Sequence, residues 1–439
     1  MFIERIRIAN FKSFKDVEVR PSGLTTLVGP NNAGKTNFAL AMEFLAEIPR
    51  HGLENAVARA GGLDGIIRRK SARPRAPIRF EIDVALVPGS EGPPELLEVI
   101  GRGDAKVRVS YSFSMAPRAS ARGPHGEFSV AREELRACVQ GEWDRQRRRE
   151  VVLYEVSRDG KGALHVEMPE KSAYARRLRS WLNSFPALER RARQGDGLPR
   201  MRQQAVLLES PFGSDPVLYA LGLAVRGISV VRFWPETARR PSPPQTAPGP
   251  PGEWGGLASA VQWLKHNARE QWRDVLGGMQ DVVPGVVDIL VKAQANGLLE
   301  LYLKEEGFAS PWRAGEVSDG TLHVLSVLVA AADPRVSALV IEEPENSLHP
   351  WMIQEMGRRL RRLAAEKTVL LTTQSPVVID MLCPGEVWVV SRKAGQTSIR
   401  RLTDLHPPIK REWEEGVAEL SQYLDSGMEP RAVPGGADG

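Results

Sequence analysis

Eight consecutive residues, Gly29-Pro30-Asn31-Asn32-Ala33-Gly34-Lys35-Thr36, follow the pattern G-x-x-x-x-G-K-T. In such a loop the glycines let successive backbone N–H groups turn inward around a phosphate group. The ammonium group of Lys35 can reach the β- and γ-phosphate oxygens, and the hydroxyl of Thr36 can ligate Mg²⁺. The pattern therefore predicts a site for a nucleoside triphosphate with Mg²⁺, rather than a glycine-rich turn that binds nothing. The predicted nucleotide contacts are Gly29, Asn31, Asn32, Ala33, Gly34, Lys35, Thr36 and Asn37.

The segments on either side of this loop favour the same interpretation. Residues 24–28 are apolar enough for a buried strand, and residues 37–48 place Phe38, Met42 and Leu45 on one face of a helix. The N-terminus of that helix would point at the phosphates, where its unpaired N–H groups and its dipole favour an anion.

A pair of carboxylates follows a second apolar run. Residues 338–341 read as a strand, and Glu342 and Glu343 come directly after it. We expect Glu342 to hold Mg²⁺ opposite Thr36, and Glu343 to accept a proton from the water that attacks the γ-phosphate. The alternative is that the two acids simply begin an exposed turn. The phosphate loop upstream favours the active-site interpretation.

Two more polar positions lie in a telling order along the chain. Ser318, followed by Asp319 and Gly320, is a natural cap for a helix that extends to about residue 332, and the N–H groups behind it would form an anion site. Gln374 follows the predicted strand 368–373 and could sense a γ-phosphate. The alternatives are an ordinary capped helix and a strand-to-turn transition.

This order of motifs resembles the ABC-type ATPases of the RecF/SMC/OLD group, and most closely the stand-alone bacterial AAA-family RecF-like ATPases. The opening residues 6–15 also resemble the first strand of that group. The resemblance implies ATP and Mg²⁺ as cofactors and ATP hydrolysis as the activity. It implies catalytic roles for Lys35, Glu343 and Gln374, a signature motif at 317–321 and a D-loop at 346–349.

The resemblance further implies that two copies of the chain form each site. The phosphate loop of one protomer would face the Ser318 helix of the other, so that ATP holds the homodimer together and hydrolysis releases it. Gln374 stands where many relatives have histidine and cannot carry a titrating proton, so we expect slow turnover. OLD proteins append a Toprim nuclease, for which the residues after Val390 are too few, so we expect no intrinsic nuclease activity.

The predicted fold class is α/β, an ABC-type P-loop NTPase head with a central, mostly parallel sheet, an antiparallel β lobe and a helical insert. We expect residues 1–60 and 310–405 to form the ATPase core and 61–170 the β lobe. Residues 171–309 would form an arginine-rich helical insert with a mobile proline-rich loop at 235–256. Residues 406–439 would form a C-terminal helix and a disordered tail.

Composition bounds the partners and the compartment. The net charge is +5, and the two cysteines, Cys138 and Cys383, allow no disulfide framework. No apolar stretch reaches membrane-spanning length, so we expect a cytoplasmic protein without a membrane partner. Arginine clusters suit DNA phosphates but are equally explained as solvated helix faces. These clusters lie at 68–75, 145–149, 176–202 and 358–362.

Two functions from different classes fit these observations. The first is an ATP-hydrolysing switch that acts on duplex DNA, or with a nuclease partner, in DNA repair or phage defence. The second is a regulatory ATPase that controls a partner effector protein without binding nucleic acid. A transporter-type ATPase subunit fits less well, because the signature differs from that of transporters and the middle of the chain is rich in strands.

Overall fold

A computed structural model describes residues 1–68, 76–86, 106–117, 128–141, 149–159, 162–167, 204–209, 216–245, 256–417 and 419–425. The chain divides into two compact units. The first contains residues 1–21, 40–228 and 393–398, and the second contains residues 22–39, 229–392 and 399–439. The expected ATPase motifs all fall in the second unit.

The first unit contains a seven-stranded antiparallel sheet in the order β2-β1-β4-β5-β6-β7-β8. Along β5 buried side chains alternate with more exposed ones, as expected for a sheet with one covered face. The predicted antiparallel lobe is therefore confirmed, but β1 and β2, which we grouped with the ATPase core, pair within this sheet. The strands are β1 (Phe2–Ala9), β2 (Asp16–Val19), β4 (Ile78–Leu86), β5 (Lys106–Pro117), β6 (Phe128–Gly141), β7 (Arg149–Arg158) and β8 (Leu164–Glu167).

Aromatic side chains form the core beneath this sheet. Phe80 of β4 stacks on Phe113 of β5 and on Phe44, with ring centroids 5.5 Å and 5.4 Å apart, and Phe11 meets Phe80 edge-on at 5.5 Å. Such offset and edge-on pairs add to the free energy gained by burying the rings. The helices of this unit are the second half of α1 (Lys35–His51), α2 (Leu53–Arg59), α3 (Leu63–Ile66), η1 (Leu207–Glu209) and α7 (Pro216–Arg226).

The second unit is built on a six-stranded sheet in the order β16-β15-β3-β14-β13-β9. The pairs β15–β3, β3–β14 and β14–β13 are parallel, and every residue of β3 and β14 is buried, as expected for strands covered on both faces. The predicted α/β class with a mostly parallel central sheet is confirmed. The strands are β3 (Leu24–Val28), β9 (Ile228–Arg232), β13 (Ala338–Glu342), β14 (Thr368–Thr373), β15 (Val387–Lys393) and β16 (Gln396–Arg401).

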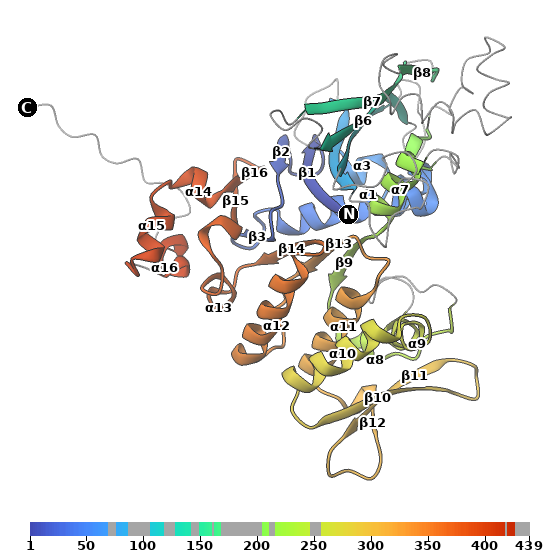
Figure 1. Cartoon of the computed structure of the whole chain (residues 1–439), viewed down its shortest axis with the longest axis vertical. Coiled ribbons are helices and arrows are strands. Elements are labelled where there is room, and N and C mark those ends of the chain that lie inside the picture. The colour runs from blue at the N-terminus through green and yellow to red at the C-terminus, as the bar shows by residue number, and fades with distance from the viewer. Residues whose placement is uncertain are drawn as a thin grey trace, which may run out of the picture. The chain divides into compact units, whose positions relative to one another are not determined.

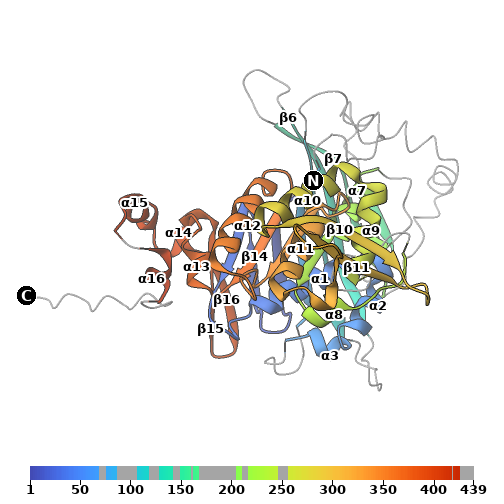
Figure 2. The ribbon, with the colours of Figure 1, turned by 90° about the horizontal axis from the view of Figure 1, so that it is seen from below.

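Helices α11 (Asp319–Ala332) and α12 (Pro350–Leu363) lie side by side next to β13 and β14 (Figure 1). Helix α12 buries Ile353, Met356 and Leu360, the apolar stripe that its sequence predicts. At one end of this unit gather the remaining short helices (Figure 2). These are α13 (Pro376–Ile379), η3 (Pro384–Glu386), α14 (Leu402–Leu405), α15 (Ile409–Glu414) and α16 (Leu420–Asp425).

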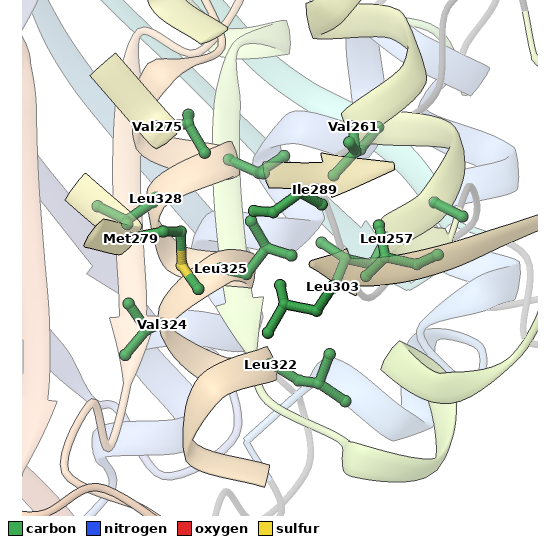
Figure 3. Close-up of a cluster of buried hydrophobic side chains, with 14 of the residues drawn as sticks. Leu257, Val261, Val275, Met279, Ile289, Leu303, Leu322, Val324, Leu325 and Leu328 are labelled. Carbon is green, nitrogen blue, oxygen red and sulfur yellow. The ribbon is translucent and has the colours of Figure 1, made fainter. Parts of the chain in front are cut away.

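Helix α11 is buried along almost its whole length, from Gly320 to Ala330. Leu322, Leu325 and Leu328 point into an apolar cluster shared with the helices and strands that precede α11 in the chain (Figure 3). These elements are α8 (Pro235–Arg239), α9 (Gly256–Asn267), α10 (Arg269–Val282), β10 (Val286–Ala293), β11 (Leu299–Glu305), β12 (Trp312–Arg313) and η2 (Ala314–Glu316).

Two expectations for the middle of the chain need correction. The insert predicted to be helical contains the antiparallel hairpin β10–β11, whose alternating residues bury one face. The proline-rich segment expected to be a loop begins with helix α8, and Ser242 exchanges backbone hydrogen bonds with Leu299. Residues 171–203 and the tail 426–439 lie outside the described residues.

A buried polar cluster in the first unit yields a testable pH dependence. Burial raises the pKa of Glu133 from 4.5 to about 6, although the Tyr111 hydroxyl and the Leu207 N–H each donate a hydrogen bond to it at 2.5 Å. Because its folded-state pKa is raised, this group stabilises the fold fully below pH 4.5 and loses that contribution as the pH rises through 6.

We therefore compare the wild type with Glu133→Gln in urea unfolding between pH 4 and 7. Relative to the variant, the wild type should lose about 2 kcal/mol of unfolding free energy over this interval. A constant offset between the two proteins reports only lost contacts with neighbours such as Arg158. A difference that does not change with pH would contradict the raised pKa.

Candidate nucleotide-binding site

The loop predicted to bind phosphate connects β3 to α1 in the second unit. Gly29 lies so close to the backbone carbonyl of Val390 on β15 that a side chain at this position would collide with it. The Gly29 N–H donates to the Thr373 carbonyl at 3.4 Å, and the Ala33 N–H to the Pro30 carbonyl at 3.2 Å. The neighbouring strands therefore hold the loop close to the end of the sheet, and only glycine fits at its start.

Lys35 is only 5% exposed, and its Nζ donates to the carbonyls of Gly29 at 2.6 Å and Pro30 at 3.1 Å. Burial lowers the pKa of this ammonium group, while the nearby Glu343, Glu345 and Glu342 act in the opposite direction. The lysine is thus folded onto its own loop and lies within the field of the acidic segment. A phosphate group would offer it stronger acceptors than the two carbonyls.

Arg392 was not singled out in the sequence, yet it contacts the same loop. Its guanidinium donates to the side-chain oxygen of Asn32 at 2.6 Å and to the Asn32 carbonyl at 3.2 Å. Asn32 itself has a left-handed backbone with φ of 64°, which asparagine tolerates better than most residues. An arginine fixed beside the loop adds positive charge where a nucleotide would bring negative charge.

The strand register brings the two predicted acids to the same edge of the sheet as the loop. Glu342 is the last residue of β13 and lies opposite Thr372, while Thr373 lies opposite Val28, which immediately precedes the loop. Glu342 forms an ion pair with Arg232 at the end of β9. The parallel sheet therefore gathers these groups at its carboxyl edge.

Glu343 is held away from the strand by an unusual backbone. Its φ of 49° is left-handed, and its N–H donates to the Thr372 carbonyl at 2.8 Å. Its partly exposed carboxylate accepts a hydrogen bond from the Asn346 side chain at 2.9 Å. A non-glycine residue held in this conformation at a cleft edge is typical of functional positions.

A third carboxylate, Glu345, was missed at the sequence level. It accepts a hydrogen bond of 2.6 Å from the Thr373 hydroxyl and another from the Gln374 N–H, and burial raises its pKa. Glu345 thus braces the acidic loop against the end of β14. The repeated acid in Glu342-Glu343-Pro344-Glu345 was the available signal.

Gln374 is exposed immediately after β14, at the same sheet edge. The structure therefore brings together the phosphate loop, Glu342, Glu343 and the backbone of Gln374. The exposed Thr36 begins helix α1 beside Lys35, so its hydroxyl is accessible.

The oxygen ligands available here suit Mg²⁺ bound together with a nucleotide. The described residues contain no group of three or more His, Cys, Asp or Glu side chains that could hold a metal by themselves. Mg²⁺ in nucleotide sites commonly takes one or two protein oxygens and completes its shell with phosphates and water. The hydroxyl of Thr36 and the carboxylate of Glu342 fit that pattern.

The predicted signature segment forms the start of α11. Ser318 caps the helix, as predicted, by accepting the Thr321 N–H at 3.2 Å, and it is exposed. Asp319 forms an ion pair with Arg239 of α8, and Arg239 also donates to the Val317 carbonyl at 2.9 Å. This arginine, which the sequence analysis missed, fixes the entry into the helix.

The D-loop packs against this helix within the same chain. A Cβ on Gly320 would lie 2.5 Å from the Ser347 carbonyl, so the glycine permits the close approach. His323 of α11 is fully buried, hydrogen-bonds the Asn346 carbonyl at 2.7 Å through Nδ1 and stacks on Phe233 at 4.5 Å. Burial lowers the pKa of His323, so the ring is neutral near pH 7.

The arginine cluster of α12 is committed to carboxylates. Arg358 pairs with Glu355, Arg359 with Asp281, and Arg361 with Glu386. Of the two interpretations offered for this cluster, a solvated and paired helix face therefore fits better than a DNA surface. The clusters at 145–149 and 176–202, and most of that at 68–75, lie outside the described residues.

Within the ranges that the structure describes, no helix is both long and apolar enough to span a membrane.

Comparisons with known proteins agree with this geometry. Two curated relatives are both described as "DNA replication and repair protein RecF". That of Beutenbergia cavernae is 29% identical over 151 residues, which are 34% of this chain and 34% of the relative. That of Cutibacterium acnes is 32% identical over 71 residues, 16% of this chain and 18% of the relative. The chain thus matches about a third or less of the length of these RecF proteins.

Solved SMC head domains are also similar. A structure described as the SMC head bound to the C-winged helix domain of ScpA covers 91% of this chain and 97% of its own, with 14% identity and a TM-score of 0.48. The SMC head domain from Thermotoga maritima covers 91% and 99%, with 10% identity and a TM-score of 0.40.

The family described as "AAA domain, putative AbiEii toxin, Type IV TA system" matches residues 24–380, which span the phosphate loop, the signature helix, the acidic pair and the switch position. The chain belongs to this family and is an ABC-type ATPase related to RecF and SMC proteins.

Proposed function

We propose that the protein is an ATP-hydrolysing switch that closes into a homodimer around ATP. The observation that carries the proposal is the meeting of Lys35, Glu342 and Glu343 at the carboxyl edge of one parallel sheet. Cationic and acidic groups placed together beside a phosphate loop have the chemistry that phosphoryl transfer to water requires.

Each residue has a distinct role in this proposal. Lys35 leaves its two carbonyl partners and binds the β- and γ-phosphate oxygens, while Thr36 and Glu342 hold Mg²⁺, which neutralises charge on the phosphates. Glu343 accepts the proton of the attacking water, and Asn346 orients its carboxylate through their hydrogen bond. The exposed amide of Gln374 hydrogen-bonds the γ-phosphate without a proton to transfer.

The signature helix supports the dimer part of the proposal. Ser318 is exposed at the N-terminus of a helix that is otherwise buried, and its described contacts are within α11 itself. Such a terminus favours an anion, and the γ-phosphate bound to a second copy would supply it. ATP would then join two protomers, and its hydrolysis would release them.

For the biological role we propose a DNA-related process, which the RecF relatives support by their description as DNA replication and repair proteins. The second candidate is a regulatory ATPase that controls an effector protein, as in phage defence. The family description, which names a toxin of a toxin–antitoxin system, and the internally paired arginines of α12 support this candidate. We place both roles in the cytoplasm.

The phosphate-loop role of Lys35 predicts a loss of nucleotide affinity in Lys35→Ala. Removing a charge-assisted hydrogen bond to phosphate should weaken binding of a fluorescent ATP analogue by about 10- to 100-fold. Lys410→Ala, which removes an exposed lysine on α15, should bind as the wild type does. Unchanged affinity in Lys35→Ala would contradict the assignment of the loop.

The role of Glu343 as the base predicts a trapped state in Glu343→Gln. The amide cannot accept the proton, so hydrolysis should fall by about 100-fold or more while ATP binding persists. Light scattering should then detect an ATP-dependent dimer, and Ser318→Arg should prevent it. Glu414→Gln, an exposed change on α15, is the control. A nucleotide-loaded Glu343→Gln protein that stays monomeric would refute the dimer.

The DNA role predicts that duplex DNA stimulates ATP hydrolysis, and that its binding weakens steeply as salt increases because phosphate contacts release counterions. Filter binding at 50 mM and 200 mM salt, together with an ATPase assay, measures both effects. Neither binding nor stimulation at low salt would exclude the DNA role and favour the effector-controlling ATPase.

A further inference from the structure

The carboxylate expected to face Mg²⁺ already has a cation of this chain as its partner. Arg232 ends β9 and Glu342 ends β13, and these strands are neighbours in the sheet. The Nε of Arg232 donates to a carboxylate oxygen of Glu342. The two side chains are 22% and 11% exposed, so the pair is largely shielded from water. A carboxylate this buried would be costly without a compensating charge.

The residues that follow Arg232 contact the signature helix. The ring of Phe233 is nearly parallel to that of His323 on α11, at 9° and a centroid distance of 4.5 Å. Arg239, at the end of α8, pairs with Asp319 and donates to the Val317 carbonyl. The short segment 232–239 therefore contacts the metal-binding carboxylate at one end and the start of α11 at two points.

We propose that Arg232 is the internal counter-ion that Mg²⁺ displaces from Glu342, and that its release loosens the hold of segment 232–239 on the signature helix. The inference rests on the proposed function, because it assigns Glu342 to Mg²⁺. It adds a link, within one chain, between the metal site and the helix expected to serve the partner's nucleotide.

Displacement follows from charge. With Mg²⁺ on Glu342, the guanidinium would lie within a few ångströms of a divalent cation in a poorly hydrated site, where like charges repel strongly. Mg²⁺ also binds carboxylate oxygen at about 2.1 Å, much closer than an arginine N–H approaches it. The ion therefore takes the carboxylate and Arg232 moves away.

Release reaches α11 because Arg232 and Phe233 are consecutive residues. A change in the backbone that frees Arg232 shifts the ring stacked on His323, and His323 in turn holds the Asn346 carbonyl of the D-loop. The first turns of α11 and the D-loop thus share one set of contacts with the segment. We call Arg232 a positioning residue, because it acts through Glu342 and not on the nucleotide.

The first test measures how much Mg²⁺ the full-length protein needs to bind a fluorescent ADP analogue. In Arg232→Gln the ion no longer competes with the guanidinium, so the half-saturating Mg²⁺ concentration should fall about tenfold. Arg232→Lys, which keeps the charge, should stay closer to the wild type. Arg358→Gln makes the same change on exposed α12 and should leave the value unchanged.

An unchanged or higher Mg²⁺ requirement in Arg232→Gln would overturn the proposal, since Arg232 would then support metal binding or play no part in it. Failure of the wild type to bind nucleotide at any Mg²⁺ concentration would instead remove the proposed function. If Arg232→Gln does not fold, Arg232→Lys and the second test still decide the matter.

The second test follows backbone hydrogen exchange in residues 318–325 with the same ADP analogue, while light scattering verifies that the protein is monomeric. In the wild type, Mg²⁺ should speed exchange several-fold. Glu342→Gln, which weakens the pair with Arg232, should exchange fast without Mg²⁺. Exchange in the wild type that is unaffected by Mg²⁺ when the metal is bound would overturn the link to the helix.

Discussion

Parallel pairing of β3, β14 and β13 is the constraint on which the site depends. These strands are buried on both faces, so their polar residues can lie only at their ends. Because the pairing is parallel, all three carboxyl ends meet at one edge. The loop after β3, the acids after β13 and Gln374 after β14 are thereby brought together, although more than 300 residues separate the first from the others.

The site at that edge is a balance of charges held ready for a ligand. Lys35 is folded onto its own loop, Glu342 is paired with Arg232, and Glu345 is buried against Thr373. Each charge has a protein partner that a nucleotide or Mg²⁺ can replace with a stronger one. The folded chain therefore tolerates a cluster of like charges without a ligand, and exchange of partners gives the ligand a structural consequence.

The signature helix shows how a functional surface is supported by a large core. Almost every side chain of α11 is buried against α9, α10, β10 and β11 or against the sheet, while Ser318 remains exposed at its tip (Figure 3). Burial of so much apolar surface fixes the helix firmly. Its tip is adjusted by polar contacts to Arg239 and the D-loop, which cost less to rearrange than the core does.

The sequence by itself determined the features that are local in the chain. The phosphate loop, the acidic pair after a buried strand and the Ser318 cap depend on residues a few positions apart, whose spacing encodes both conformation and chemistry. The order of these motifs was enough to indicate the family and a mostly parallel α/β sheet. The expected roles of Asp319, Gly320 and Gln374 came only from the resemblance.

Only the tertiary structure decided which distant residues meet. Arg232 and Glu342 are 110 positions apart, and their pairing follows from the placement of β9 beside β13. The same reason applies to Arg239 beside Asp319, and to β1 and β2 in the antiparallel sheet. Strand order and helix packing arise from burial summed over the whole fold, and no short stretch of sequence carries that information.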